Sequence, residues 1–123
     1  MGKTVLVVDD SSTMRQMVTF SLKGAGYDVV EAGDGEEAVA KLNGGAKPHV
    51  VITDLNMPKM DGLALISAVR AMPAFKFTPI LMLTTESDDA KKKAGQAAGA
   101  TGWLVKPFGP DQMLAVIKKV LPA

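Results

Sequence analysis

Short runs of apolar, mostly branched residues recur along this chain at regular intervals and constrain its fold more than any other feature. The five runs are Val5–Val8, Val29–Ala32, Val50–Thr53, Ile80–Leu83 and Trp103–Val105. Each run is too short for a helix, and none alternates clearly between apolar and polar residues, which is typical of strands buried on both faces. Segments with helical spacing of apolar residues lie between the runs. We therefore expect five strands that alternate with five helices.

Capping residues divide the chain at the same places. We expect helices to end near Gly24–Gly26, Asn43–Gly45 and Gly99, and we expect later helices to begin at Asp34, Asp61, Ser87 and Asp111. Strands separated by helices require right-handed crossovers, which place helices on both faces of a parallel sheet. The sequence therefore predicts an α/β fold, a doubly wound three-layer (βα)5 domain.

The fourth predicted helix differs from the others in its apolar positions. Over the segment 88–98, the predicted inward stripe contains only alanines, namely Ala90, Ala94, Ala97 and Ala98. Alanine buries little apolar surface, and elements with few buried apolar contacts open most easily. We expect this helix to be the most weakly packed.

Length and charge narrow the class of protein. The 123 residues suffice for about one ordinary domain, so we expect residues 1–123 to form a single domain without an output domain. The 14 basic and 13 acidic residues nearly cancel, which argues against nucleic-acid binding through phosphates. The chain has no cysteine, as is usual in a reduced compartment, and no apolar stretch near the roughly 20 residues that span a membrane. We therefore expect a cytoplasmic protein that binds neither nucleic acid nor membrane.

Polar residues follow four of the predicted strands. Asp9 and Asp10 follow the first, Asp54 the third, Thr84 the fourth and Lys106 the fifth. The carboxyl ends of parallel strands meet at one edge of the sheet, where ligands bind. Clustered carboxylates repel one another unless a cation joins them, and oxygen ligands without His or Cys suit Mg²⁺. Such a pocket fits a phosphoryl group that an aspartate attacks, with an ammonium offsetting its charge and a hydroxyl donating to it.

Four elements in this order resemble the signature of the receiver domain of bacterial two-component response regulators: Asp9-Asp10, Asp54–Gly62, Thr84 and Lys106–Phe108. The resemblance covers nearly the whole chain. It implies a flavodoxin-like fold with a five-stranded sheet in the order 2-1-3-4-5. It also implies that the protein is not an enzyme with a separate substrate, but a phosphoacceptor that assists its own phosphorylation and dephosphorylation.

The resemblance implies a role for each matching residue. Asp54 is the phosphoacceptor. The carboxylates of Asp9, Asp10 and Asp54 and the main-chain carbonyl of Asn56 hold Mg²⁺. Lys106 pairs with the acidic cluster or with the phosphoryl group.

Finer details resemble the chemotaxis, or CheY-like, branch of the family. In the family as a whole, the resemblance makes Thr84 a switch that moves toward the phosphoryl oxygens, and Trp103 stands where many members have an aromatic residue whose rotamer follows the Thr. Asn56 and Glu86, each two residues past a signature residue, match the pair that tunes hydrolysis of the acyl phosphate.

The same resemblance implies partners. A histidine kinase, CheA-like in the chemotaxis branch, donates the phosphoryl group. The flagellar motor switch protein, or another protein target, binds the surface formed by the fourth helix, fifth strand and fifth helix. The protein is expected to act as a monomer.

One other interpretation of the same site stays open at this stage, and two from other classes of protein are disfavoured. A phosphate sink or a phosphorelay shuttle would share the site without direct control of a motor. A hydrolase that forms an aspartyl phosphate is disfavoured, because such enzymes usually need a second Asp where Asn56 stands. A flavin-binding protein is disfavoured because the flavin phosphate would meet the acidic pair Asp9-Asp10.

Asp9 or Asp10 taken alone could equally be a helix cap, but with Asp54 and Lys106 present we expect both to belong to the site. We expect Asp61 to be only a cap.

Overall fold

One parallel sheet with the strand order β2-β1-β3-β4-β5 forms the centre of the molecule. The computed structural model describes residues 3–55, 57, 59–85, 89–106 and 108–121. The strands are β1 (Thr4–Val8), β2 (Asp28–Ala32), β3 (Val50–Asp54), β4 (Ile80–Thr85) and β5 (Gly102–Lys106). The helices are α1 (Ser12–Gly24), α2 (Gly35–Asn43), α3 (Gly62–Arg70), α4 (Asp89–Ala98) and α5 (Pro110–Val120), with a 3₁₀ turn η1 (Pro73–Phe75) before β4. The predicted fold and strand order are confirmed.

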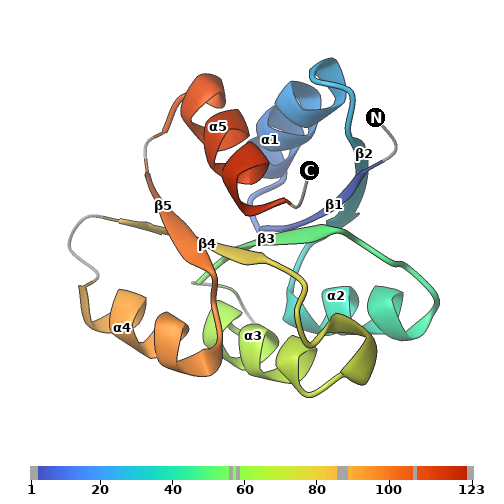
Figure 1. Ribbon diagram of the computed structural model, residues 1–123, viewed down its shortest axis with the longest axis vertical. Coiled ribbons are helices and arrows are strands. Elements are labelled where there is room, and N and C mark those ends of the chain that lie inside the picture. Colours follow the sequence, from blue (N-terminus) through green and yellow to red (C-terminus); the bar gives the residue numbers. More distant parts are fainter. Residues whose placement is uncertain (1–2, 56, 58, 86–88, 107, 122–123) are drawn as a thin grey trace.

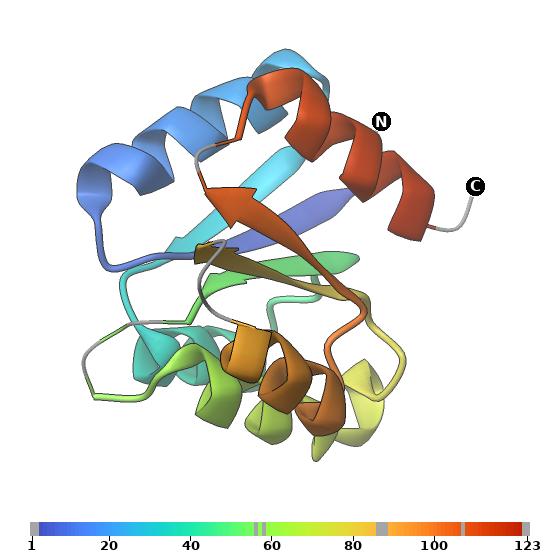
Figure 2. The same cartoon turned by 90° about the vertical axis from the view of Figure 1, so that its left-hand side faces the viewer.

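The helices cover both faces of this sheet. Helices α1 and α5 lie on one face, and α2, α3 and α4 lie on the other (Figures 1 and 2). Successive side chains of a strand point to opposite faces, so Val5 and Val7 join the core beneath α1 and α5, while Leu6 and Val8 join the core above α2 and α3. All four are fully buried, which explains why β1 reads as a continuous apolar run.

Three residues that we placed just after strands lie within them. Asp54 and Lys106 are the last residues of β3 and β5, and Thr84 lies inside β4. The expectation that they follow the strands is wrong because the ladder continues through them. Asp54 pairs with Leu83, and Thr84 pairs with Val105. These functional candidates are therefore held by sheet hydrogen bonding rather than by loops.

Most predicted helix boundaries are confirmed. Asp34 and Asp61 are N-caps whose carboxylates accept from backbone N–H groups three residues on, at 2.8 and 2.9 Å. The prediction that Asp111 begins the last helix is wrong. Gly109 is the N-cap there, and Pro110 begins the helix, because a proline lacks the N–H that the first helical position leaves unpaired. The predicted start at Ser87 lies outside the described residues.

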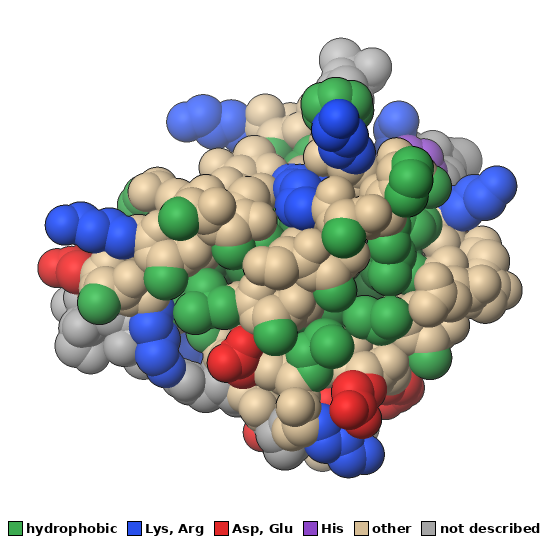
Figure 3. All heavy atoms as spheres, turned by 90° about the horizontal axis from the view of Figure 1, so that it is seen from below, with side chains coloured by type: hydrophobic (Ala, Val, Ile, Leu, Met, Phe, Trp, Pro, Cys, Tyr) green, Lys and Arg blue, Asp and Glu red, His purple; other side chains and the backbone are tan. Residues whose placement is uncertain are grey.

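Helix α4 is packed differently from the prediction. Of the four predicted alanines, Ala90, Ala94 and Ala97 are exposed, and Ala98 is half-buried against the core. Within the described helix Gly95 is the only buried residue. A Cβ atom at Gly95 would lie 1.9 Å from the sulfur of Met82 on β4. The absence of a side chain at Gly95 therefore lets the helix pack closely against the sheet at this position. Figure 3 shows the face formed by α2, α3 and α4, with apolar side chains between the helices.

A second close approach involves glycine at the start of α3. A Cβ atom at Gly62 would lie 2.3 Å from the carbonyl oxygen of Asp54 and 2.8 Å from the Cα of Leu55. The N–H of Gly62 donates to the carbonyl of Leu55 at 3.0 Å. Both atoms that a side chain would meet first belong to the main chain and cannot turn away. The absence of a side chain at Gly62 therefore lets α3 begin directly against the end of β3.

Replacing Gly62 with alanine tests this contact. We expect Gly62→Ala to lower the free energy of unfolding by about 3 kcal/mol, because the added methyl group must displace the main chain at Asp54. Gly24→Ala is the matched control, since a Cβ at Gly24 meets nothing within 4 Å. In a helix, that change stabilises by roughly 0.5–1 kcal/mol. Urea unfolding measures both; equal stability of Gly62→Ala and the parent would contradict the contact.

Candidate functional site

Three carboxylates meet at the carboxyl edge of the sheet, as the sequence predicts. One ligand atom from each of Asp9, Asp10 and Asp54 can be chosen so that all lie within 4.8 Å of one another. Asp9 and Asp54 are buried, while Asp10 is exposed. β1 and β3 are neighbours in the sheet, and this pairing brings together residues that lie far apart in the sequence.

The carboxylate of Asp54 is held from two sides. Its Oδ2 accepts a hydrogen bond from Lys106 Nζ at 3.1 Å, which is also an ion pair between β3 and β5. Its Oδ1 accepts from the N–H of Leu55 at 2.8 Å. The hydroxyl of Thr53 donates to the carbonyl of Asp54 at 2.9 Å. The Asp54 side chain and main chain are thus both oriented by neighbours, and the ammonium lies where it can offset added negative charge.

Asp9 is the least favourably placed of the three carboxylates. Its Oδ1 accepts from the N–H of Ser11 at 2.9 Å, but its buried Oδ2 has no hydrogen-bond partner among the described residues. Burial raises the pKa of Asp9, and the negative charges of Asp54 and Asp10 raise it further, against the hydrogen bond from Ser11 and the charge of Lys106. A cation at the cluster would supply what this oxygen lacks.

The proposed cap role of Asp9 and Asp10 is not what the structure shows. Ser11 is the N-cap of α1, and its hydroxyl accepts from the N–H of Met14 at 3.2 Å. Asp9 instead accepts from Ser11 in the turn that precedes the helix. Asp61, in contrast, is the cap of α3 as expected. The acidic pair after β1 is therefore directed to the cluster rather than to the helix.

The remaining predicted site residues divide into three groups. Thr84 is buried on β4, in the strand next to both β3 and β5. Trp103 lies on β5 away from the cluster, with 38% of its surface exposed and its ring centroid 5.8 Å from Lys92 Nζ. Asn56 and Glu86 lie outside the described residues. The roles predicted for all four residues stay predictions.

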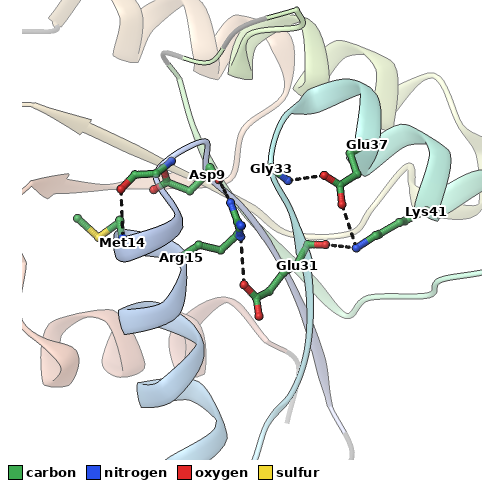
Figure 4. Close-up of polar contacts among 8 residues, drawn as sticks. Asp9, Met14, Arg15, Glu31, Gly33, Glu37 and Lys41 are labelled. Atoms are coloured by element: carbon green, nitrogen blue, oxygen red, sulfur yellow. Dashed lines mark hydrogen bonds and ion pairs between the residues drawn. The ribbon is translucent and has the colours of Figure 1, made fainter.

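A network of charged residues beside the cluster was not foreseen from the sequence. Arg15 of α1 contacts both the main chain of Asp9 and the side chain of Glu31 on β2, and Lys41 and Glu37 of α2 continue the network (Figure 4). One signal was present, because Glu31 lies inside the apolar run of β2. A charge in such a run needs a partner, but the sequence alone does not show which of the basic residues it meets.

The comparison with protein families agrees with this site. A profile described as the response regulator receiver domain matches residues 5–118. This chain belongs to the response regulator receiver family. The family comprises phosphoacceptor proteins, in agreement with the predicted class.

This receiver is similar to chemotaxis proteins over more than nine-tenths of their lengths. It is 47% identical over 118 residues to chemotaxis protein CheY1 of Helicobacter pylori strain J99, covering 95% of each chain. It is 42% identical over 118 residues to the CheY homolog of Campylobacter jejuni strain 81-176, covering 95% of this chain and 91% of that one.

Solved structures give the same result. The structure of Vibrio cholerae chemotaxis protein CheY4, crystallised at low pH, is 52% identical to this receiver. It superposes with a TM-score of 0.93 over 98% of this chain and 100% of that one. The predicted CheY-like branch is thereby supported, and the phosphate-sink alternative is not favoured.

No described helix is both long and apolar enough to cross a bilayer.

Asp9→Asn tests the repulsion within the acidic cluster. In a metal chelator at neutral pH, we expect this change to raise the free energy of unfolding by on the order of 1 kcal/mol, because it removes a buried charge. The pKa of Asp9 is raised by folding, so the penalty for its ionised form is present above that pKa. The gain should therefore shrink as the pH falls through this pKa toward the ordinary value, where Asp9 becomes protonated in both states.

Urea unfolding of both proteins at several pH values measures the difference. Asp28→Asn is the control, because Asp28 is an exposed residue at the start of β2 and its substitution should change little. An Asp9→Asn variant that is less stable than the parent at neutral pH in chelator would show that repulsion does not dominate.

Proposed function

We propose that this receiver is a CheY-type chemotaxis response regulator whose Asp54 accepts a phosphoryl group from a histidine kinase. The arrangement of Asp54 carries the proposal: a buried carboxylate beside two further carboxylates, with an ammonium 3.1 Å from its Oδ2. In the transfer, an oxygen of Asp54 forms a bond to phosphorus as the bond from phosphorus to the histidine nitrogen breaks. The electron pair of that bond stays on the imidazole.

The residues present fit Mg²⁺ as the cofactor. Asp9, Asp10 and Asp54 offer only oxygen ligands, which magnesium prefers, and the buried Oδ2 of Asp9 lacks a partner among the described residues. We propose that these three carboxylates and the main-chain carbonyl of Asn56 hold the ion. When bound, Mg²⁺ neutralises charge on the phosphoryl oxygens and on the carboxylates.

Each remaining site residue has a task in this proposal. Lys106 already lies against Asp54, so its ammonium offsets negative charge on the phosphoryl group during and after transfer. The hydroxyl of Thr84 donates to a phosphoryl oxygen, which requires a shift at the end of β4. Trp103 follows this shift, and Asn56 and Glu86 tune how water hydrolyses the acyl phosphate.

The phosphoryl group ends on the protein, so the outcome is a change in binding rather than a released product. We propose that the chain from 1 to 123 acts as one receiver domain, in the cytoplasm with its kinase, and that its output is a protein contact. The kinase is CheA-like, and the target is the flagellar motor switch protein.

We place the target contact on α4, β5 and α5. A hollow of about 570 Å³ lies there, lined by residues of β5 and α5 that include Trp103, Val116 and Lys119. Lys92 of α4 lies over the Trp103 ring, and Lys118 and Lys119 are exposed on α5. An apolar hollow with ammonium groups around it suits a partner segment that combines apolar and acidic side chains.

Incubation with acetyl phosphate and Mg²⁺ tests the acceptor. We expect the intact mass of the parent to increase by one phosphoryl group and the mass of Asp54→Asn to stay unchanged, because an amide is not a nucleophile here. Asp61→Asn is the matched control, since Asp61 is an exposed helix cap, and it should be labelled like the parent. Labelling of Asp54→Asn to the parental extent would overturn the assignment of Asp54.

Charge reversal on the proposed contact surface tests the output. We expect Lys119→Glu to weaken binding of the phosphorylated protein to the purified motor switch protein by about tenfold at low salt, with a smaller loss as salt rises. Lys47→Glu, a reversal at an exposed residue before β3, should bind like the parent, and both variants should be phosphorylated normally. If the phosphorylated parent is formed rapidly but does not bind the motor switch protein, the receiver functions as a phosphate sink or shuttle instead.

A further inference from the structure

Arg15 makes two directional contacts next to the acidic cluster. Its Nη1 donates to the main-chain carbonyl of Asp9 at 2.6 Å, and its Nε donates to Oε1 of Glu31 at 3.0 Å (Figure 4). The Arg15 side chain is 21% exposed. The guanidinium is planar and presents several donors in a fixed geometry, so one bond to the residue after β1 and one to β2 fix its orientation.

Glu31 is itself anchored on β2. It pairs with Val7 in the β1–β2 ladder, and its carbonyl accepts a hydrogen bond from Lys41 Nζ. Lys41 also pairs with Glu37 at 3.2 Å, and Glu37 accepts from the N–H of Gly33 at 2.8 Å. The contacts from α2 therefore hold the main chain of Glu31, and the Glu31 carboxylate reaches Arg15 from this fixed position.

The carbonyl that Arg15 binds belongs to the peptide that joins Asp9 to Asp10. On the other side of Asp9, its N–H donates to the carbonyl of Ala32 at 3.1 Å. The main chain at Asp9 is thus held at its N–H by β2 and at its carbonyl by Arg15. Because the N–H of Asp9 is held by β2, the direction of its carbonyl sets where the rigid peptide places the Cα of Asp10, and so where the Asp10 carboxylate lies relative to that of Asp9.

We propose that Arg15 is a positioning residue for the cation site. It holds the Asp9–Asp10 peptide in the orientation that makes the two carboxylates converge with Asp54. This inference rests on the proposed function, in which these carboxylates hold Mg²⁺. Arg15 donates to the main-chain carbonyl of Asp9 and not to its carboxylate, so in this proposal Arg15 acts through the metal ligands.

The sign of the effect separates positioning from simple charge. A guanidinium near a cation site repels the cation, so loss of its charge alone would strengthen Mg²⁺ binding. Loss of a positioning contact would weaken it. Residues that orient metal ligands typically change metal affinity by about 10–100-fold when substituted, so the two interpretations predict opposite changes.

The proposal is tested by titrating the metal-free protein with Mg²⁺ alone. Calorimetry measures the affinity, and the amide NMR signals of Asp9 and Asp10 report binding at the site. We expect Arg15→Met, which keeps the apolar stem but no donor, to bind Mg²⁺ about tenfold more weakly. Arg15→Lys should recover part of the loss, because an ammonium can donate to the carbonyl. Lys23→Met, at the exposed end of the same helix, should bind like the parent. Urea unfolding in chelator reports stability separately.

Each outcome decides a specific point. Unchanged or tighter Mg²⁺ binding by Arg15→Met, with the parent binding normally, would overturn the positioning role and leave the proposed function in place. If Arg15→Met does not fold, Arg15→Gln decides, because it also removes the charge and is too short to keep both bonds: weaker binding than the parent supports the role, and parental or tighter binding overturns it. A parent that binds no Mg²⁺ would overturn the proposed function and this inference together. Lower stability with parental Mg²⁺ affinity would show that Arg15 is only structural.

Discussion

Mutual repulsion among Asp9, Asp10 and Asp54 is the constraint on which the rest of this structure depends. Ligand oxygens of the three can lie within 4.8 Å of one another, two of the residues are buried, and an oxygen of Asp9 has no partner among the described residues. Like charges at such spacing are unfavourable without a cation. The scaffold must therefore hold them together at the expense of stability, and the neighbouring contacts are explained by that requirement.

Several elements contribute to holding the cluster, and each acts on the main chain or on a charge. The ladder keeps β1 beside β3, Lys106 reaches Asp54 from β5, and Gly62 lets α3 begin against the carbonyl of Asp54. Arg15 approaches from the opposite side and binds the carbonyl of Asp9. Asp9 and Asp54 are thus held by neighbours from both sides while Asp10 stays exposed, in keeping with a site preorganised for the proposed phosphoryl group.

Helix α4 contrasts with this rigid surround. It meets the sheet through Gly95, against Met82, and Met82 lies two residues before Thr84 on the same face of β4. A glycine inside a helix costs about 1 kcal/mol relative to alanine, and few apolar side chains of α4 are buried. Among the five α-helices, α4 has the fewest buried residues in the part of the chain that the structure describes. Few buried contacts are typical of elements that open easily, which suits the proposed change in partner affinity on phosphorylation.

The sequence by itself determined the alternation of strands and helices, the parallel sheet and most helix caps, because buried parallel strands form recognisable apolar runs in the sequence. It also determined that Asp9, Asp10, Asp54 and Lys106 converge, because the carboxyl ends of parallel strands meet at one edge of the sheet. The sequence predicted most of the inward stripe of α4 wrongly, because the helix packs closely at Gly95 against Met82 of β4, a contact between distant parts of the chain. It also predicted the start of α5 wrongly, because Asp111 is a residue type that often caps helices but Gly109 is the N-cap here. Tertiary structure alone decided which oxygen of Asp9 is left without a described partner, which side of the cluster Lys106 occupies and that Arg15 pairs with Glu31. These contacts join residues whose meeting depends on packing and direction, and neither spacing nor composition encodes them.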